Sequence, residues 1–286
     1  MRRHRRSGGL LIAFGTHDIG SSCFREFSKG KGSVVIRKSI LLTGGGAGIG
    51  EGIAHVLGER GWHVLVNDVN EPAAHAVARA VNGTPLPGDI RKDPKGLVER
   101  AFGIAGALHA LVNNAGIIRR SPLAETSEAD LDLVYEVNLK AMIQLSQAAL
   151  PHLQQTAGAI VNISSIAAKN PQPTAGFYSM SKAGVSAFTC LAAQEWGPLG
   201  VRVNGVAPGL IRTAMAEAVY SVPELYEKRR MMMPLRRIGA PADIGRVVAF
   251  LLSDDAAYVT GQVIEVDGGY SQTLIEHLPH PGSPKS

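Results

Sequence analysis

From residue 39 onward, short apolar runs alternate with longer amphipathic stretches. This alternation is typical of βαβ units, in which parallel strands form one sheet and helices cover both of its faces. It predicts a doubly wound α/β fold of about seven strands in three αβα layers. The expected strands are residues 40–42, 63–67, 85–86, 110–113, 159–163, 202–206 and 263–266. The expected helices are residues 49–60, 72–81, 95–105, 128–155, 176–196 and 241–252.

A glycine-rich turn follows the first expected strand. Residues 43–50 read Thr-Gly-Gly-Gly-Ala-Gly-Ile-Gly and lead directly into a helical pattern. Glycine lets a backbone approach a pyrophosphate closely, and the N-terminus of the helix favours its negative charge. The spacing departs from the usual GxGxxG fingerprint, and a glycine-rich turn alone is more often an ordinary loop. Its place between strand and helix favours a dinucleotide site, because ligands of such sheets bind beyond the carboxyl ends of the strands.

An acidic residue ends the second expected strand. Asp68 follows Gly50 by eighteen residues. A carboxylate here would bind the ribose hydroxyls of an adenosine and repel a 2′-phosphate. Neither Ala47 nor Val69 supplies a cation that would attract that phosphate. The sequence therefore predicts NAD as the cofactor, with NADP less favoured.

Ser165, Tyr178 and Lys182 form a candidate proton-transfer group. Residues four apart share one face of a helix, so Lys182 would lie near the phenol of Tyr178. A free tyrosine titrates near pH ~10, and a neighbouring cation favours its phenolate. A tyrosine and a lysine at this spacing are common on exposed helices, so the pair gains meaning only from the rest of the chain.

These motifs resemble those of the short-chain dehydrogenase/reductase family over about residues 38–272. The further matches are Asp89-Ile90, the NNAG segment at 113–116, Asn138, the segment at 204–213 and the last strand region at 259–269. The resemblance implies a Rossmann-like single catalytic domain. It also implies an NAD(P)-dependent oxidoreductase that acts on CH–OH groups.

The resemblance implies four catalytic residues. Tyr178 would exchange a proton with the substrate oxygen while hydride passes to or from the nicotinamide, and Ser165 would stabilise charge on that oxygen. Lys182 would bind the nicotinamide ribose and lower the pKa of Tyr178, and Asn138 would hold a water in a proton relay. Purely structural roles compete with these: a turn-capping hydroxyl for Ser165 and hydrogen bonding within a helix for Asn138. The implied cofactor-binding residues are Gly44, Gly48, Ile49, Gly50, Asp68, Asp89, Ile90, Asn114, Ala115, Gly116, Tyr178, Lys182, Pro208, Gly209, Ile211 and Thr213.

The implied substrate is a small secondary alcohol or ketone, with a sugar, a sugar acid or a 3-oxoacyl compound as candidates. Residues 113–120 are similar to those of sugar-acid dehydrogenases in the family, so Arg119 or Arg120 could pair with a substrate carboxylate. Solvated loop arginines or subunit contacts are the commoner explanation of such a pair. The resemblance further implies a homotetramer built on the helices of residues 128–155 and 178–196 and on the last strand.

The basic character of the chain is confined to its first residues. The net charge is +5, but residues 1–38 carry +7 and the remainder −2, so nucleic acid is not an expected partner. No apolar run reaches the ~18 residues of a membrane span. Cys23 and Cys190 suggest neither a disulfide framework nor a metal site. We therefore expect a soluble, cytoplasmic protein without a metal or a membrane partner.

Three parts of the chain are expected. Residues 1–37 form a basic N-terminal extension that is disordered or precedes the natural start, which we expect near Val34; residues 38–272 form the catalytic domain, and residues 273–286 form a tail. An alternative function is an NAD-responsive regulatory or binding protein that uses this basic extension. Filled catalytic positions favour the enzyme.

Residues 210–240 interrupt the alternation of strands and helices. They contain Pro223, Pro234 and three consecutive methionines at 231–233. Such a segment is typical of a mobile lobe over a pocket, and a plain pair of surface helices is the other interpretation.

Overall fold

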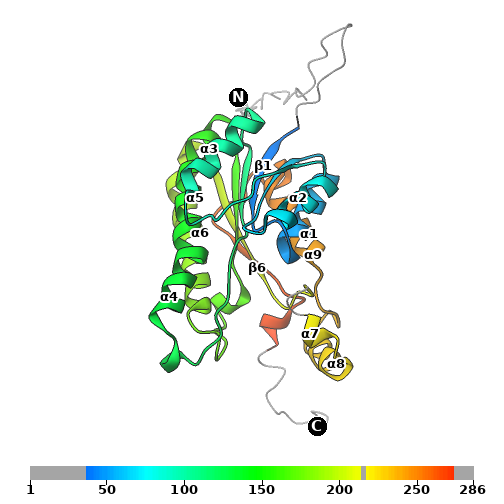
Figure 1. The fold of residues 1–286 in the computed structure, drawn as a ribbon. Coiled ribbons are helices and arrows are strands. Elements are labelled where there is room, and N and C mark those ends of the chain that lie inside the picture. The colour runs from blue at the N-terminus through cyan, green and yellow to red at the C-terminus, as the bar shows by residue number, and fades with distance from the viewer. Residues whose placement is uncertain (1–36, 214–216, 274–286) are drawn as a thin grey trace, which may run out of the picture. The chain divides into compact units, whose positions relative to one another are not determined.

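The computed structural model describes residues 37–213 and 217–273. All strands in these ranges belong to one parallel sheet of seven strands. The strand order is β3-β2-β1-β4-β5-β6-β7 (Figure 1), so the winding direction reverses between β1 and β4. The strands are β1 (Ser39–Thr43), β2 (His63–Asn67), β3 (Thr84–Pro85), β4 (Ala110–Asn113), β5 (Ala159–Ile163), β6 (Arg202–Pro208) and β7 (Val263–Val266). The predicted doubly wound, Rossmann-like α/β fold is confirmed, and each strand lies within two residues of its expected bounds.

Helices cover both faces of the sheet (Figure 1). One face is covered by α1 (Gly48–Glu59), α2 (Glu71–Ala80) and α9 (Pro241–Leu252). The other is covered by α3 (Pro94–Ala105), α5 (Ala141–Gln155) and α6 (Tyr178–Trp196). Each layer of helices therefore encloses its own hydrophobic core against the sheet.

The central strand β1 contributes to both cores. Ile40 and Leu42 pack into the core beneath α1, α2 and α9, whereas Leu41 packs into the opposite core. Successive side chains of a strand point to opposite faces, so a strand that is covered on both sides must be apolar throughout. This requirement explains why the strands could be recognised as continuous apolar runs.

Local signals fix the ends of the helices. The side chain of Asp93 accepts a hydrogen bond of 2.8 Å from the backbone N–H of Gly96 and caps the start of α3. Gly106 ends the same helix in the left-handed region, at φ 72°. An aspartate before the first turn and a glycine after the last are favoured because they satisfy backbone groups that the helix leaves unpaired.

The stretch expected as one helix at 128–155 is divided in the structure. Residues Glu128–Tyr135 form α4, Glu136–Lys140 form a π-helical turn, and α5 follows. In a π turn each N–H bonds to the carbonyl five residues earlier, which adds one residue to the turn and shifts the helical faces. Hydrophobic periodicity continues across such a turn, so the division was not predicted.

Helix α6 starts two residues later than expected. Gly176 has a φ of 57°, in the left-handed region, which a right-handed helix does not continue. The helix therefore begins at Tyr178, and this places the candidate acid/base in its first turn.

A small lobe follows β6. It contains α7 (Glu217–Tyr220) and α8 (Pro223–Met232), and its apolar cluster is centred on Tyr220, Met233 and Ile238. Of the three consecutive methionines, Met233 is buried in this cluster, whereas Met231 and Met232 are exposed. The lobe therefore contains a pair of helices, as the interpretation of this segment as surface helices expects, and Met233 packs into its apolar cluster.

The described part of the chain begins at Arg37, whose guanidinium donates hydrogen bonds to the carbonyls of Gly61 and Asn82. The expectations for residues 1–36 and 274–286 lie outside the described residues. Within the described ranges, no helix is long and apolar enough to cross a bilayer.

Candidate active site

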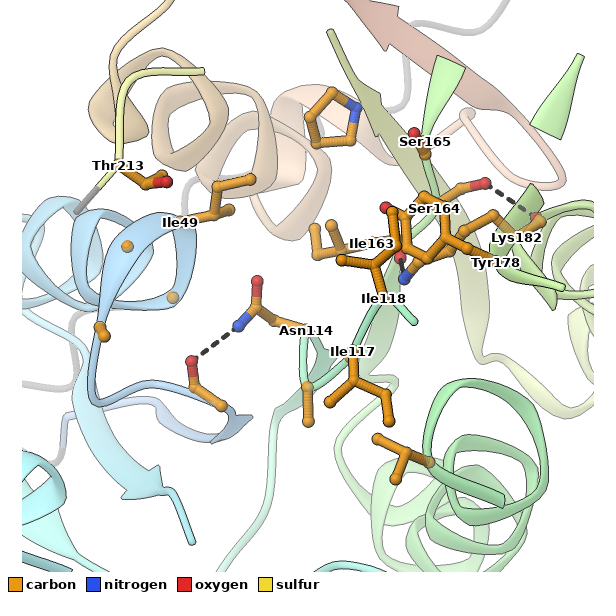
Figure 2. A pocket seen from close by; sticks show the side chains of 18 of the residues that line it. Ile49, Asn114, Ile117, Ile118, Ile163, Ser164, Ser165, Tyr178, Lys182 and Thr213 are labelled. Carbon is orange, nitrogen blue, oxygen red and sulfur yellow. Dashed lines mark hydrogen bonds between the residues drawn. The ribbon is translucent and has the colours of Figure 1, made fainter. Parts of the chain in front are cut away.

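A cavity of about 770 Å³ lies at the carboxyl edge of the sheet. The segments that follow β1, β2, β4, β5 and β6 all contribute to its walls. Figure 2 shows Ser165, Tyr178 and Lys182 together on one side, with Ile49 and Thr213 opposite and Asn114 between them. The sequence predicted this edge as the ligand site, and its motifs meet there.

The glycine turn packs so tightly that side chains would not fit. Gly44 is left-handed at φ 61°, and a Cβ there would lie 2.8 Å from the Cα of Ala115. A Cβ on Gly50 would overlap the carbonyl oxygen of Gly44 and approach the Asn114 amide. The turn therefore leaves its backbone bare at the N-terminus of α1, which is the cradle that a pyrophosphate requires.

Polar contacts join this turn to the end of β4. The hydroxyl of Thr43 accepts hydrogen bonds from the backbone N–H groups of Asn114 and Ala115, at 3.1 and 3.2 Å. The side-chain amide of Asn114 donates to the carbonyls of Thr43 and Gly44, at 3.0 and 2.8 Å. The floor of the cavity is thus fixed at the point where the strand order reverses.

Asp68 lies beside the glycine turn, as expected of a ribose ligand. Its two carboxylate oxygens each accept a 2.9 Å hydrogen bond, one from the N–H of Gly46 and one from that of Asn70. Each oxygen has a lone pair left for a hydroxyl donor. The residues present therefore fit an adenosine ribose with free hydroxyls.

Asp89 is engaged by a residue that the sequence analysis did not select. The guanidinium of Arg91 donates hydrogen bonds to both carboxylate oxygens of Asp89, with an Nη2–Oδ2 distance of 2.6 Å. This hydrogen bonding is the main reason why the pKa of Asp89 lies below its usual value. Arg91 also lies 3.8 Å from Glu136 and lines the cavity, while Ile90 is buried beside it.

Lys182 is buried within the site. Its ammonium donates a 2.8 Å hydrogen bond to the carbonyl of Ile163 and lies 5.8 Å from the centre of the Tyr178 ring. Burial lowers the pKa of Lys182 to about 8, because leaving water disfavours the charged form. Two N–H groups of the ammonium remain available toward the cavity.

The pKa of Tyr178 is set by opposing influences. Burial is the largest and raises the pKa, whereas hydrogen bonding with Ser165 and the positive charge of Arg120 lower it. The sequence analysis assigned the lowering to Lys182, but the charge that acts on the phenol in this structure belongs to Arg120. With a pKa of about 8, Lys182 is still mostly protonated at neutral pH.

Asn138 lies behind the cavity wall instead of lining it. Its carboxamide oxygen accepts from the N–H of Ile117 at 2.8 Å, and its amide donates to the Ile117 carbonyl and to the Ser181 hydroxyl, at 2.9 and 3.0 Å. A Cβ on Gly116 would lie 3.3 Å from both the Asn138 oxygen and the Lys182 ammonium. Asn138 therefore fixes the segment after β4 and faces Lys182 across Gly116.

The segment after β6 completes the wall. Pro208, Gly209 and Thr213 line the cavity, and Thr213 packs next to Gly48. Ile211 differs from the expectation, because its side chain is buried in the core on the α1 side and does not line the cavity. Its contribution is to hold the segment, through a bridge between its backbone and Gly239.

Comparisons with known proteins decide the family. A profile described as enoyl-(acyl carrier protein) reductase matches residues 44–271. The 3-oxoacyl-[acyl-carrier-protein] reductase FabG of Staphylococcus aureus is 39% identical over 241 residues, which cover 81% of this chain and 97% of that protein. A solved short-chain type dehydrogenase/reductase from Mycobacterium ulcerans is 32% identical with a TM-score of 0.77, covering 82% of this chain and 90% of that one. This chain belongs to the short-chain dehydrogenase/reductase family.

A further solved structure that resembles this chain carries a different assigned substrate. It is assigned as a gluconate dehydrogenase from Agrobacterium tumefaciens, is 28% identical, covers 83% of this chain and 97% of that one, and has a TM-score of 0.77. Membership confirms that the chain is an oxidoreductase that interconverts an alcohol and a ketone with a nicotinamide cofactor. The alternative of a regulatory binding protein is not favoured.

Sequence reasoning missed part of this dehydrogenase/reductase site. Many of the missed residues lie in the segments that connect a strand end to the next helix, so the strand assignment itself could have drawn attention to these segments. The missed lining residues include Ala47, Val69, Arg91, Ile117, Ile118, Leu133, Val137, Ile163, Ser164, Ile166, Ala167, Gln172 and Leu210. No group of three or more His, Cys, Asp or Glu residues within the described ranges could hold a metal ion.

Proposed function

We propose that the protein is an NAD(H)-dependent dehydrogenase/reductase in which Tyr178 is the general acid and base. The observation that carries this proposal is the position of the Tyr178 phenol. It lies at the cavity beside Ser165 and Lys182, and the same cavity reaches the bare glycine turn and Asp68. The bound nicotinamide would supply the hydride acceptor or donor.

In the proposed mechanism, the protein moves the proton. During alcohol oxidation the Tyr178 phenolate takes the hydroxyl proton as hydride leaves the carbinol carbon, and during ketone reduction the phenol returns that proton. Ser165 donates a hydrogen bond to the substrate oxygen, where charge develops. The buried Lys182 orients the nicotinamide ribose with the N–H groups that Ile163 does not use.

Asn138 is assigned to the proton relay. Both N–H groups of its amide are engaged, but among the described residues its oxygen accepts a hydrogen bond from Ile117 alone, and it faces Gly116 and Lys182. A water at that oxygen could accept a proton from the Lys182 ammonium and pass it outward.

The preference for NAD is proposed on Asp68. A 2′-phosphate on the bound ribose would meet the Asp68 carboxylate, and Arg91, the lining cation that follows β3, is held by Asp89. The negative charges of the phosphate and of the Asp68 carboxylate repel each other, which disfavours the binding of NADP. We also propose a cytoplasmic location, because the described cysteine, Cys190, is a free thiol.

The substrate candidates are a sugar, a sugar acid or a 3-oxoacyl compound. The names of the related FabG and of the protein assigned as a gluconate dehydrogenase support the last two. We further propose a homotetramer, a catalytic domain at residues 38–272, and no role for nucleic acid or membrane.

The test compares turnover with NAD(H) and NADP(H) over secondary alcohols, oxo acids, sugar acids and 3-oxoacyl thioesters. We expect NAD(H) to be preferred, and Tyr178→Phe to lower kcat at least ~10²-fold without loss of folding or cofactor binding. Tyr226→Phe is the matched control, because its phenol lies in the small lobe outside the cavity. Unchanged turnover in Tyr178→Phe would remove the assignment, and a preference for NADP(H) would remove the role of Asp68.

A further inference from the structure

Charge is distributed unevenly along the cavity. The acidic lining residues, Asp68 and Asp89, follow β2 and β3, on the side of the switch point that faces the proposed adenosine. The charged residues that line the other side, after β4 and in α6, are Arg119, Arg120 and Lys182. Among the described lining residues, no carboxylate faces this reacting end, so it is electropositive.

The two arginines after β4 differ in their partners. The guanidinium of Arg119 lies 3.5 Å from the carboxylate of Asp130, at the start of α4. Arg120 makes no ion pair or hydrogen bond with any described residue, and its charge acts on the Tyr178 phenol. The charge of Arg119 is therefore compensated within the protein, whereas Arg120, an exposed residue of the cavity wall, keeps an uncompensated charge.

The backbone holds Arg120 next to the segment that carries Tyr178. The N–H of Ser121 donates a 3.1 Å hydrogen bond to the carbonyl of Thr174, and Ser121 forms a parallel bridge with Ala175. A Cβ on Gly176 would lie 2.9 Å from the carbonyl oxygen of Arg119, so the two segments are in close contact. Since α6 begins at Tyr178, two residues after Gly176, the backbone places Arg120 in advance beside the segment that leads into the acid/base.

We propose that Arg120 binds the carboxylate of an oxo acid or hydroxy acid substrate, and that Arg119 does not. The inference rests on the proposed oxidoreductase function and specifies its substrate class. A guanidinium matches a carboxylate with two parallel hydrogen bonds, and a single uncompensated cation balances a single negative charge. A neutral thioester would leave Arg120 without a partner near the reacting carbonyl.

The kinetic test uses matched pairs of substrates that differ in charge. One pair is gluconate and glucitol, and the other is acetoacetate and the acetoacetyl thioester of N-acetylcysteamine. The measured quantity is the ratio of kcat/KM for the acid to that for its uncharged partner. We expect Arg120→Gln to lower this ratio roughly 10- to 100-fold, as loss of a charged hydrogen-bonded pair does, and Arg120→Lys to restore part of it.

Arg119→Gln is the matched comparison, because it removes an equal charge from the neighbouring position. We expect the ratio of kcat/KM between acid and uncharged partner to change by less than about threefold in Arg119→Gln. An unchanged ratio in Arg120→Gln, an equal fall in Arg119→Gln, or a wild-type enzyme that prefers the uncharged partner of both pairs would each overturn the proposal.

A binding experiment separates this inference from the proposed function. In Tyr178→Phe loaded with NADH, calorimetric titration with gluconate and acetoacetate measures affinity without turnover. We expect at least one acid to bind, and its Kd to rise roughly tenfold or more when Arg120→Gln is added. If the wild type shows no turnover but an acid binds and loses affinity in Arg120→Gln, the catalytic assignment is contradicted and the role of Arg120 is not. Failure of both acids to bind, or binding that ignores Arg120, would refute the role of Arg120.

Discussion

At the residue scale, Lys182 and Tyr178 respond to burial in opposite directions. Burial lowers the pKa of the Lys182 ammonium to about 8 and raises that of the Tyr178 phenol. Both shifts favour the neutral forms, because the interior disfavours charge of either sign. At neutral pH the site without cofactor therefore holds a neutral phenol beside an ammonium that is still mostly protonated, and a bound ligand can change both protonation states.

The pH dependence of stability follows from the lysine shift. Between about pH 8 and pH 10 the unfolded chain keeps the Lys182 proton that the folded protein loses, so stability rises with pH in this window. This added stability is lost as the pH falls from about 10 to about 8, and below pH 8 both states hold the Lys182 proton. Above pH 10 the raised pKa of Tyr178 acts in the reverse sense, since the unfolded phenol ionises first.

Lys182→Met tests this linkage by urea denaturation at pH 7.5, 8.5 and 9.5. The gain in stability with pH that wild type owes to Lys182, on the order of 1 kcal/mol per pH unit, should vanish in the variant. Lys95→Met is the matched control, because Lys95 is exposed on α3. Parallel pH curves for wild type and Lys182→Met would contradict the burial of an ionisable amine at this position.

The residues of the site were predictable to different degrees. Tyr178, Ser165 and Lys182 were recognisable because their spacing is short and local. The difference between Arg119 and Arg120 was not, because it depends on Asp130, which approaches Arg119 only when α4 folds back on the loop. Arg91 was missed for a similar reason: it shares the cavity wall with residues from distant strands.

At the element scale, the glycine turn and α3 provide a contrast between two kinds of glycine. Gly50→Ala forces a methyl group onto the Gly44 carbonyl, and overpacking of this kind costs about 1–3 kcal/mol. Gly103 lies exposed within α3, where a Cβ meets no atom within 4 Å. Gly103→Ala should therefore stabilise the protein by about 0.5–1 kcal/mol, because alanine loses less backbone entropy.

Thermal denaturation and calorimetric NAD titration distinguish the two variants. Gly50→Ala should lower both Tm and NAD affinity, whereas Gly103→Ala should raise Tm and leave NAD affinity unchanged. Wild-type NAD affinity in Gly50→Ala would show that the turn does not approach the cofactor closely.

Elements were predicted well where burial alone determines them. Strands β1, β4 and β5 are buried along their whole length, so their apolar runs were visible in the sequence. The π turn at Glu136–Lys140 was not visible, because one extra residue in a helical turn leaves the apolar pattern nearly unchanged. It matters for the site, since Asn138 lies within that turn and secures Ile117.

At the scale of the whole molecule, two sets of exposed apolar side chains outside the small lobe bear on assembly. Tyr135 on α4 and Met180 and Leu191 on α6 form one group, and Phe250 on α9 and Tyr258, shortly before β7, form another. The edge strand β7 is only half-buried along its whole length. Two distinct self-complementary interfaces are what a tetramer of dihedral symmetry requires.

Size-exclusion chromatography with light scattering tests the tetramer. Wild type should have about four times the 30.2 kDa mass of the chain. A charge buried in either interface is costly, so Leu191→Glu and Tyr258→Glu should each reduce the assembly to a dimer, through different contacts. Leu225→Glu on α8 is the control, because this exposed leucine belongs to the small lobe and to neither group. A monomeric wild type would contradict the assembly, and a variant that stays tetrameric would show that its residue lies in neither interface.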